Sequence, residues 1–80
     1  MKFITYAIIN QQGLIYKGIT SDLEKRLNYH NRGRSRWTKR RGPFKLLYSE
    51  TFQSKTEALK HEKFLKSGKG REMLKKIVRV

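Results

Sequence analysis

The chain has 80 residues, with 20 Lys and Arg against 6 Asp and Glu and a formal net charge of +14 at pH 7. This length predicts a single domain, residues 1–80, with a small core, and the absence of cysteine excludes disulfides and thiolate metal sites. No segment reaches the roughly 20 apolar residues of a membrane span. The N-terminal residues lack the order of a signal peptide, so we expect a cytoplasmic protein.

The excess of positive charge predicts a polyanionic partner, and nucleic acid is the natural one. An anionic membrane surface would use the same charge, but it would favour a basic amphipathic helix with an aromatic apolar face. Here the basic residues are spread over the whole chain. Charge that serves only solubility is the remaining interpretation.

The first third of the chain predicts a β-hairpin. Phe3–Ile9 is apolar and rich in β-branched residues, Asn10–Gly13 has turn chemistry, and Leu14–Ile19 is the expected returning strand. If the pairing is centred on Gln11, Tyr6 and Tyr16 lie opposite each other on one sheet face. A slip by one residue would place them on opposite faces.

A helix is predicted over about residues 22–31. It begins with a capping box at Ser21–Glu24, which has a second acid in the first turn. The apolar stripe of this helix ends at His30, and Arg26 lies at the edge of the stripe, one turn earlier.

The segment that follows is the most basic part of the chain. Ser35 or Thr38 could cap a short helix in this segment, and Gly42-Pro43 would end that helix. Its cationic and aromatic side chains, with Lys17 on the second strand, are the candidate nucleic-acid contacts: Arg32, Arg34, Arg36, Trp37, Lys39, Arg40 and Arg41.

The second half of the chain predicts a third strand and two helices. The strand is Phe44–Phe52, and a capping box at Ser54–Glu57 opens a helix over residues 55–66. Gly68–Gly70 is expected to break that helix, and residues 71–77 form a last basic one. The fold expectation is therefore α+β: a three-stranded antiparallel sheet flanked by helices. Both hairpin tyrosines and the helix with Arg26 should share one concave face.

Glu62 differs from the other acids. Ala58, Glu62 and Leu65 fall at i, i+4 and i+7, so the carboxylate should lie in the core-facing stripe of its helix. Such a group needs a partner. An ion pair with Arg26 or a lysine is one possibility, and a hard divalent metal such as Mg²⁺ is the other. The remaining acids have structural explanations in caps, first turns or a strand: Asp22, Glu24, Glu50, Glu57 and Glu72.

Taken singly, the other candidates also have ordinary explanations. Tyr6 and Tyr16 could be strand aromatics, and Arg26 could be one more solvated cation. His30 could be a helix-end cation or a satisfied core histidine. Their occurrence together at set spacings, in so basic a chain, favours a site for phosphodiester chemistry.

These segments resemble the GIY-YIG nuclease domain, in particular its small stand-alone bacterial members and the catalytic domain of the bacterial excision-repair incision subunit. Ile4–Tyr6 and Tyr16–Gly18 represent the two motifs that name the family, and residues 18–27 continue into the helix that carries the family arginine. His30 matches a position four beyond that arginine, and residues 56–62 match the segment that ends in the metal-binding glutamate. The similarity covers nearly the whole chain.

Phosphodiester hydrolysis needs an activated water and neutralisation of charge on the phosphate. Glu62 would hold one Mg²⁺ or Mn²⁺, and Arg26 would clamp the phosphate. The resemblance implies that one of the two tyrosines is the general base. We favour Tyr16, with Tyr6 hydrogen-bonded to the water or phosphate. His30 would orient the site or relay a proton.

The resulting hypothesis is a metal-dependent endonuclease acting on DNA, with RNA as the alternative substrate and DNA repair as the implied setting. Substrate choice should rest on DNA structure or a partner, because a chain of this size leaves no room for a recognition domain. No membrane and no small-molecule cofactor are expected. The alternatives are a non-catalytic nucleic-acid-binding module of the same fold, and a small basic structural protein of ribosome or chromatin type.

Overall fold

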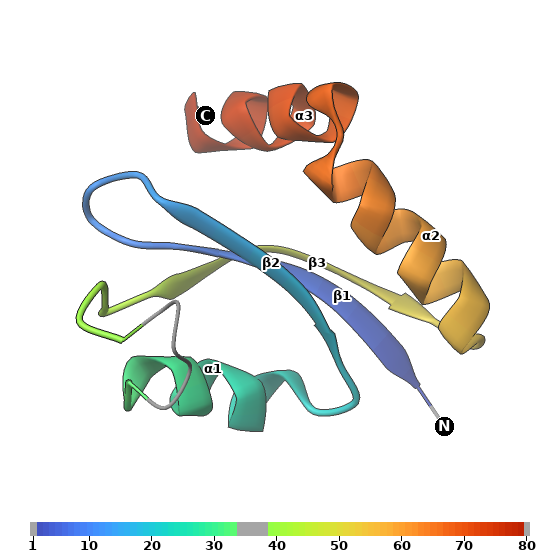
Figure 1. Ribbon diagram of the computed structural model, residues 1–80, viewed down its shortest axis with the longest axis horizontal. Coiled ribbons are helices and arrows are strands. Elements are labelled where there is room, and N and C mark those ends of the chain that lie inside the picture. Colours follow the sequence, from blue (N-terminus) through green and yellow to red (C-terminus); the bar gives the residue numbers. More distant parts are fainter. Residues whose placement is uncertain (1, 34–38, 80) are drawn as a thin grey trace.

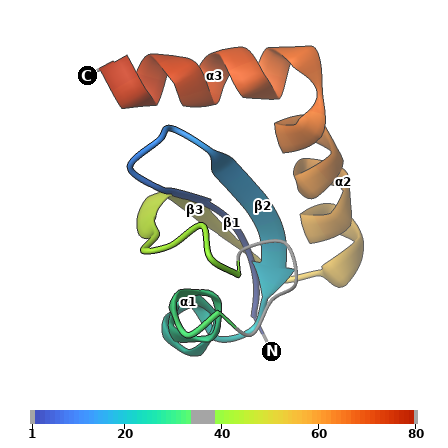
Figure 2. The ribbon, with the colours of Figure 1, turned by 60° about the vertical axis from the view of Figure 1, so that its left-hand side comes forward.

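The computed structural model describes residues 2–33 and 39–79. Three antiparallel strands form one sheet in the order β2-β1-β3: β1 (Phe3–Ile9), β2 (Ile15–Thr20) and β3 (Lys45–Phe52). Three helices cover it: α1 (Leu23–Asn31), α2 (Lys55–Lys66) and α3 (Gly68–Arg79). The helix α1 lies on one face of the sheet, and α2 with α3 lies on the other (Figures 1 and 2). The predicted α+β architecture is confirmed.

The central strand β1 supplies a core on each face, because successive side chains of a strand point in opposite directions. Tyr6 and Ile8 face α1 and pack with the buried Phe44. Ala7 faces the other layer and packs with Leu65 and Leu74 of α2 and α3. A strand covered on both sides needs mainly apolar residues, which explains the composition of β1; the buried Thr5 within it donates a hydrogen bond to the Glu50 carbonyl at 3.4 Å.

The hairpin register differs by two residues from the expectation. Tyr6 is paired with Gly18, and Tyr16 with Ile8, so the pairing is centred on Gln12 instead of Gln11. A shift of two preserves the face of every side chain, so the expectation that both tyrosines share a face is confirmed, although they are diagonal neighbours.

The cause of the register lies in the turn. The side-chain oxygen of buried Asn10 accepts hydrogen bonds from the backbone N–H groups of Gln12 (3.1 Å) and Leu14 (2.8 Å). Gly13 has a positive φ of 85°. Leu14 is therefore part of the turn, and β2 begins one residue later than expected.

The start of α1 corrects the predicted capping box. The cap is Asp22, whose carboxylate accepts a hydrogen bond from the Lys25 N–H at 3.1 Å, instead of Ser21. Thr20 fixes this position, because its hydroxyl accepts from the Asp22 N–H and donates to the Asp22 carbonyl. For α2 the expected cap, Ser54, is confirmed.

The corner between α2 and α3 also differs from the expectation. Gly68–Gly70 does not separate the helices but forms the first turn of α3, and the chain bends at Ser67. Ser67 accepts two hydrogen bonds from the start of α3. Its Oγ accepts from the Gly70 N–H at 3.3 Å, and its carbonyl accepts from the Arg71 N–H at 3.0 Å. We expected Glu72 in the first turn of this helix, near the positive end of the helix dipole, but it lies beyond that turn.

Gly70 is needed for a reason other than breaking a helix. A Cβ atom at this position would overlap the backbone of Phe64 and Leu65. Only glycine lets α3 cross so close to the end of α2.

None of the described helices is long and apolar enough to cross a membrane. The short helix expected near Ser35 or Thr38 falls outside the described residues.

Candidate active site

The side chain of Tyr6 leans from the central strand over the edge strand β2. It is 2% exposed. A Cβ atom placed on Gly18, its cross-strand partner, would lie 2.7 Å from the Tyr6 hydroxyl oxygen and 2.9 Å from Cζ. The glycine therefore provides the space for the phenol, which is a common reason for glycine inside a strand.

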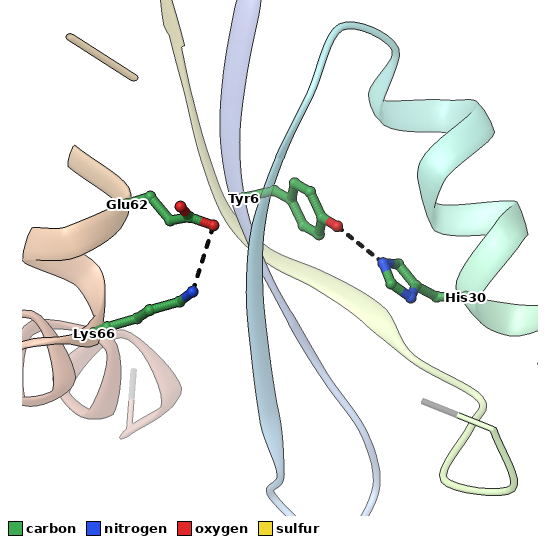
Figure 3. A network of polar contacts seen from close by, with 4 residues as sticks. All are labelled: Tyr6, His30, Glu62 and Lys66. Atoms are coloured by element: carbon green, nitrogen blue, oxygen red, sulfur yellow. Dashed lines mark hydrogen bonds and ion pairs between the residues drawn. The ribbon is translucent and has the colours of Figure 1, made fainter. Parts of the chain in front are cut away.

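Tyr6 and His30 form a buried hydrogen bond of 2.9 Å between the phenol oxygen and the imidazole Nε2 (Figure 3). Burial, followed by the charge of Arg26, lowers the pKa of His30 below its usual range, so the ring is neutral at pH 7. Burial, Tyr16 and Glu62 raise the pKa of Tyr6 far above that of an ordinary phenol, although Arg26 acts in the opposite direction. Tyr6 is therefore a protonated hydrogen-bonding group at neutral pH.

Tyr16 completes a three-ring cluster. Its ring centroid lies 4.8 Å from that of His30 and 6.5 Å from that of Tyr6. Tyr16 is half-buried, whereas Tyr6 and His30 are buried. The structure thus brings together three of the four residues that we expected to be catalytic, and Tyr16 is the one most accessible from solvent.

The fourth, Arg26, lies one turn before His30 on α1 and is half-buried. Its guanidinium carbon is 5.3 Å from the centroid of the Tyr29 ring, a cation–π distance. Its positive charge lowers the pKa values of both Tyr6 and His30. A cation with a fixed fork of donors therefore stands beside the ring cluster, as phosphate binding requires.

Glu62 approaches from the other layer. In Figure 3 its carboxylate points toward β2 from the α2 side, and the Tyr6–His30 pair lies on the far side of that strand. Because its negative charge contributes to the raised pKa of Tyr6, the two groups interact across the strand. Glu62 therefore lies on the other side of β2 from the ring cluster, whereas the two tyrosines share the face that α1 covers, as expected.

The environment of Glu62 also differs from the prediction of a core position. Ala58 and Leu65 are fully buried, but the Glu62 side chain is 21% exposed. Its carboxylate forms an ion pair with Lys66, one turn later, at 3.5 Å. Of the cationic side chains proposed as its ion-pair partner, Arg26 or a lysine, the structure shows the lysine.

The residues fit a hard divalent cation in a specific way. The described residues contain no group of three or more His, Cys, Asp or Glu side chains that could enclose a metal ion. Mg²⁺ keeps several waters and is commonly bound by one or two carboxylates together with substrate phosphates. A single half-buried carboxylate such as Glu62 is compatible with that mode of binding.

The segment that joins α1 to β3, called here the basic loop, is anchored at both of its ends. The Asn31 side chain exchanges two hydrogen bonds with the backbone of Phe44, at 2.7 and 3.1 Å. The Asn10 amide donates to the Arg41 carbonyl at 2.8 Å. Four of the expected nucleic-acid contacts are exposed on the described parts of this loop: Arg32, Lys39, Arg40 and Arg41.

Four other contacts were expected from the sequence. Arg34, Arg36 and Trp37 fall outside the described residues. Lys17 is paired with Ala7 and therefore faces α2 and α3, away from the ring cluster.

A second tyrosine–histidine pair on the opposite face provides a contrast. Tyr48 is 2.9 Å from His61 Nε2 and donates a hydrogen bond to Glu50. Burial, that hydrogen bond and the negative charge of Glu50 raise the pKa of Tyr48 to about 12. The charged residue that acts on Tyr48 is an acid, Glu50, whereas the cation Arg26 lies beside Tyr6. The two tyrosine–histidine pairs therefore differ in the charged group beside them, a cation for Tyr6 and an anion for Tyr48.

Five residues that shape the site were not predicted as site residues, although Gly18 belongs to the Tyr16–Gly18 motif and Asn10 to the predicted turn: Gly18, Asn10, Asn31, Tyr29 and Lys66. A signal existed for two of them. Gly18 interrupts a strand, which indicates a close approach of another group. Lys66 stands four residues after Glu62, the spacing of a helical ion pair.

Gly18→Ala tests the packing of the site. The new methyl group would force the Tyr6 phenol from its place, and because Tyr6 is buried this overpacking should cost about 1–3 kcal/mol. For a domain of this size each kcal/mol lowers the melting temperature by roughly 4–8 °C. Thermal unfolding followed by circular dichroism measures the change.

Two variants control for this result. Gly68→Ala adds the same methyl group where nothing lies within 4 Å, and it should leave the melting temperature equal or higher. Combining Gly18→Ala with Tyr6→Phe removes the closest atom and should recover part of the loss. An unchanged melting temperature for Gly18→Ala alone would contradict the packing described.

The comparison with known families assigns the chain to a class of nuclease domains. The model of the GIY-YIG catalytic domain matches residues 2–76, and the chain belongs to this family. It is a family of endonucleases that act on DNA and generally use divalent metals.

Individual relatives are named UPF0213 proteins. One from Streptococcus agalactiae is 45% identical over 62 residues, covering 76% of this chain and 70% of the relative. One from Staphylococcus saprophyticus is 39% identical over 77 residues, 95% of this chain and 94% of the relative. The solution NMR structure of a UPF0213 protein from Bacillus halodurans is similar with a TM-score of 0.58 and 32% identity, covering 96% of this chain and 85% of that one.

Proposed function

We propose that this protein is a metal-dependent endonuclease that hydrolyses phosphodiester bonds in DNA and selects its substrate by structure instead of sequence. The observation that carries the proposal is the hydrogen-bonded Tyr6–His30 pair over Gly18, with Tyr16 against it and Arg26 beside it. Glu62 lies across the same edge strand. This arrangement supplies acid–base groups, a phosphate ligand and a carboxylate for a cation around one point of the sheet.

The protonation states support a division of labour between the two tyrosines. Tyr6 is buried and keeps its proton, so it serves as a positioning hydrogen-bond donor or acceptor. Tyr16 is more accessible and is the better candidate for contact with the attacking water. As the water attacks, Tyr16 would accept its proton and pass the phenolic proton toward the neutral His30 ring.

Charge on the phosphate is handled by the two groups on either side. Arg26 would bind non-bridging phosphate oxygens through its fork of N–H donors. Glu62 would hold Mg²⁺ or Mn²⁺, which when bound neutralises phosphate charge and stabilises the leaving oxygen.

A non-catalytic nucleic-acid-binding module of the same fold is the second candidate. The ion pair between Glu62 and Lys66 favours it, because the carboxylate already has a cation as its partner. The net charge of +14 suits either function.

Incubation with supercoiled, branched and single-stranded DNA in Mg²⁺ or Mn²⁺ separates the two candidates, with a matched RNA as a further arm. We expect nicking or cleavage of at least one DNA substrate with metal and none in EDTA. If no substrate is cleaved in either metal while DNA is still bound, the binding module replaces the nuclease.

DNA affinity should fall steeply as salt rises, because phosphate contacts release counterions. If about six to eight phosphates are neutralised, the slope of log K against log salt is about −5 to −7 on duplex DNA. Fluorescence anisotropy of labelled duplex in EDTA measures this slope without cleavage. A nearly flat dependence would contradict an electrostatic DNA-binding surface.

A further inference from the structure

The corner between α2 and α3 brings two cations together that belong to neither the ring cluster nor the basic loop. Gly70 lies against the backbone of Leu65, closer than any side-chain-bearing residue could. Lys66 follows Leu65 and Arg71 follows Gly70, so this contact holds the two cationic residues at the same corner. Both side chains are exposed.

A third cation reaches the corner from the sheet. Lys17 is paired across the hairpin with Ala7, and Ala7 packs against Leu65 and Leu74. Lys17 therefore lies on the side of β2 that α2 and α3 cover, and it is half-buried there. Burial, Arg71 and Lys66 all lower the pKa of Lys17, as expected for three cations that share this corner.

The positive charge of this corner is not balanced within the described part of the chain. Lys66 is paired with Glu62 at 3.5 Å, but neither Lys17 nor Arg71 forms an ion pair with any described residue. Like charges in a partly desolvated place repel one another and raise the free energy of the folded chain. A bound anion would relieve that repulsion.

We propose that Lys17, Lys66 and Arg71 form a second phosphate-binding site, which holds the backbone of duplex DNA at the α2–α3 corner. The inference rests on the proposed function in that DNA is the substrate. Arg26 and the basic loop contact the duplex from the α1 side of β2, and the corner contacts it from the other side. The DNA therefore crosses the edge of the sheet, with Glu62 between the two contact areas.

Lys66 is shared between this site and Glu62. While it pairs with Glu62 it is less available to a phosphate, and removal of the Glu62 charge releases it. Duplex binding should therefore become tighter in Glu62→Gln, and this gain should depend on Lys66.

The test measures the salt dependence of duplex DNA binding in EDTA, where no cleavage occurs. Lys17→Met and Arg71→Met should each reduce the magnitude of the log–log slope by about 0.9, the contribution of one phosphate contact, and Lys66→Met should do so in the Glu62→Gln background. Lys60→Met and Lys76→Met are matched controls, because both remove one exposed charge from the same two helices. Their slopes should stay close to that of the wild type.

A double-mutant cycle provides the second arm. Glu62→Gln should tighten binding more in the wild-type background than in Lys66→Met, because only the wild type has a Lys66 to release. Equal slopes for the corner variants and the controls, or the same gain in both backgrounds, would overturn the proposal. Because both arms measure binding in EDTA, an absence of cleavage in Mg²⁺ would remove the nuclease function and leave the phosphate site standing.

Discussion

Glu62→Gln should abolish metal-dependent DNA cleavage while duplex binding is kept and becomes tighter. Glutamine keeps the shape of the side chain but loses the charge with which Glu62 would hold a divalent cation. Binding is retained because the substitution removes a negative charge from a strongly basic surface. Nicking of supercoiled DNA in Mg²⁺ or Mn²⁺ measures the first effect, and anisotropy with labelled duplex in EDTA measures the second.

Stability should change little in this variant. The Lys66 side chain is 57% exposed, and helical ion pairs of this kind contribute about 0.3–0.5 kcal/mol. Glu57→Gln is the matched control, since it removes an exposed carboxylate from the first turn of the same helix. It should cleave like the wild type. Normal cleavage by Glu62→Gln, or equal loss in both variants, would contradict the assignment of Glu62.

The periodic parts of the fold could be predicted because local sequence determines them. The strand Phe3–Ile9 and the helix over residues 55–66 have the predicted bounds. The common face of Tyr6 and Tyr16 was also predictable, because every register that differs by two residues preserves it. The register itself could not be predicted, because it depends on which N–H groups of the turn donate to the Asn10 side chain.

The relation of Glu62 to the rest of the site depends on tertiary packing. Its helical spacing correctly places it on the sheet-facing side of α2, but spacing does not show that α2 also contacts the edge strand β2. A side chain there reaches solvent and Lys66 instead of the core. The role predicted for Gly68–Gly70, to break a helix, was wrong for a related reason. Two glycines close together in a sequence suggest a helix break, but Gly70 permits the close contact between α2 and α3, which only the tertiary structure shows.

Arg26→Ala should lower the cleavage rate by ~10²–10³, the usual loss when one preorganised electrostatic partner of a transition state is removed. Arg26 is half-buried, and its charge reaches both Tyr6 and His30. Single-turnover cleavage at saturating protein measures the effect on the chemical step. Arg26→Lys should recover only part of the rate, because an ammonium group keeps the charge without the planar fork of donors.

A second readout separates this role from a general loss of positive charge. Arg26 is one of the causes that lower the pKa of His30, so this pKa should rise in Arg26→Ala, toward the value of an ordinary histidine. An NMR titration of the His30 ring protons follows it. Lys25→Ala removes an exposed charge from the adjacent position of α1 and should leave both rate and pKa close to wild type. If Arg26→Ala and Lys25→Ala reduce the rate equally, Arg26 contributes only to the general attraction of DNA, and the phosphate clamp must be assigned elsewhere.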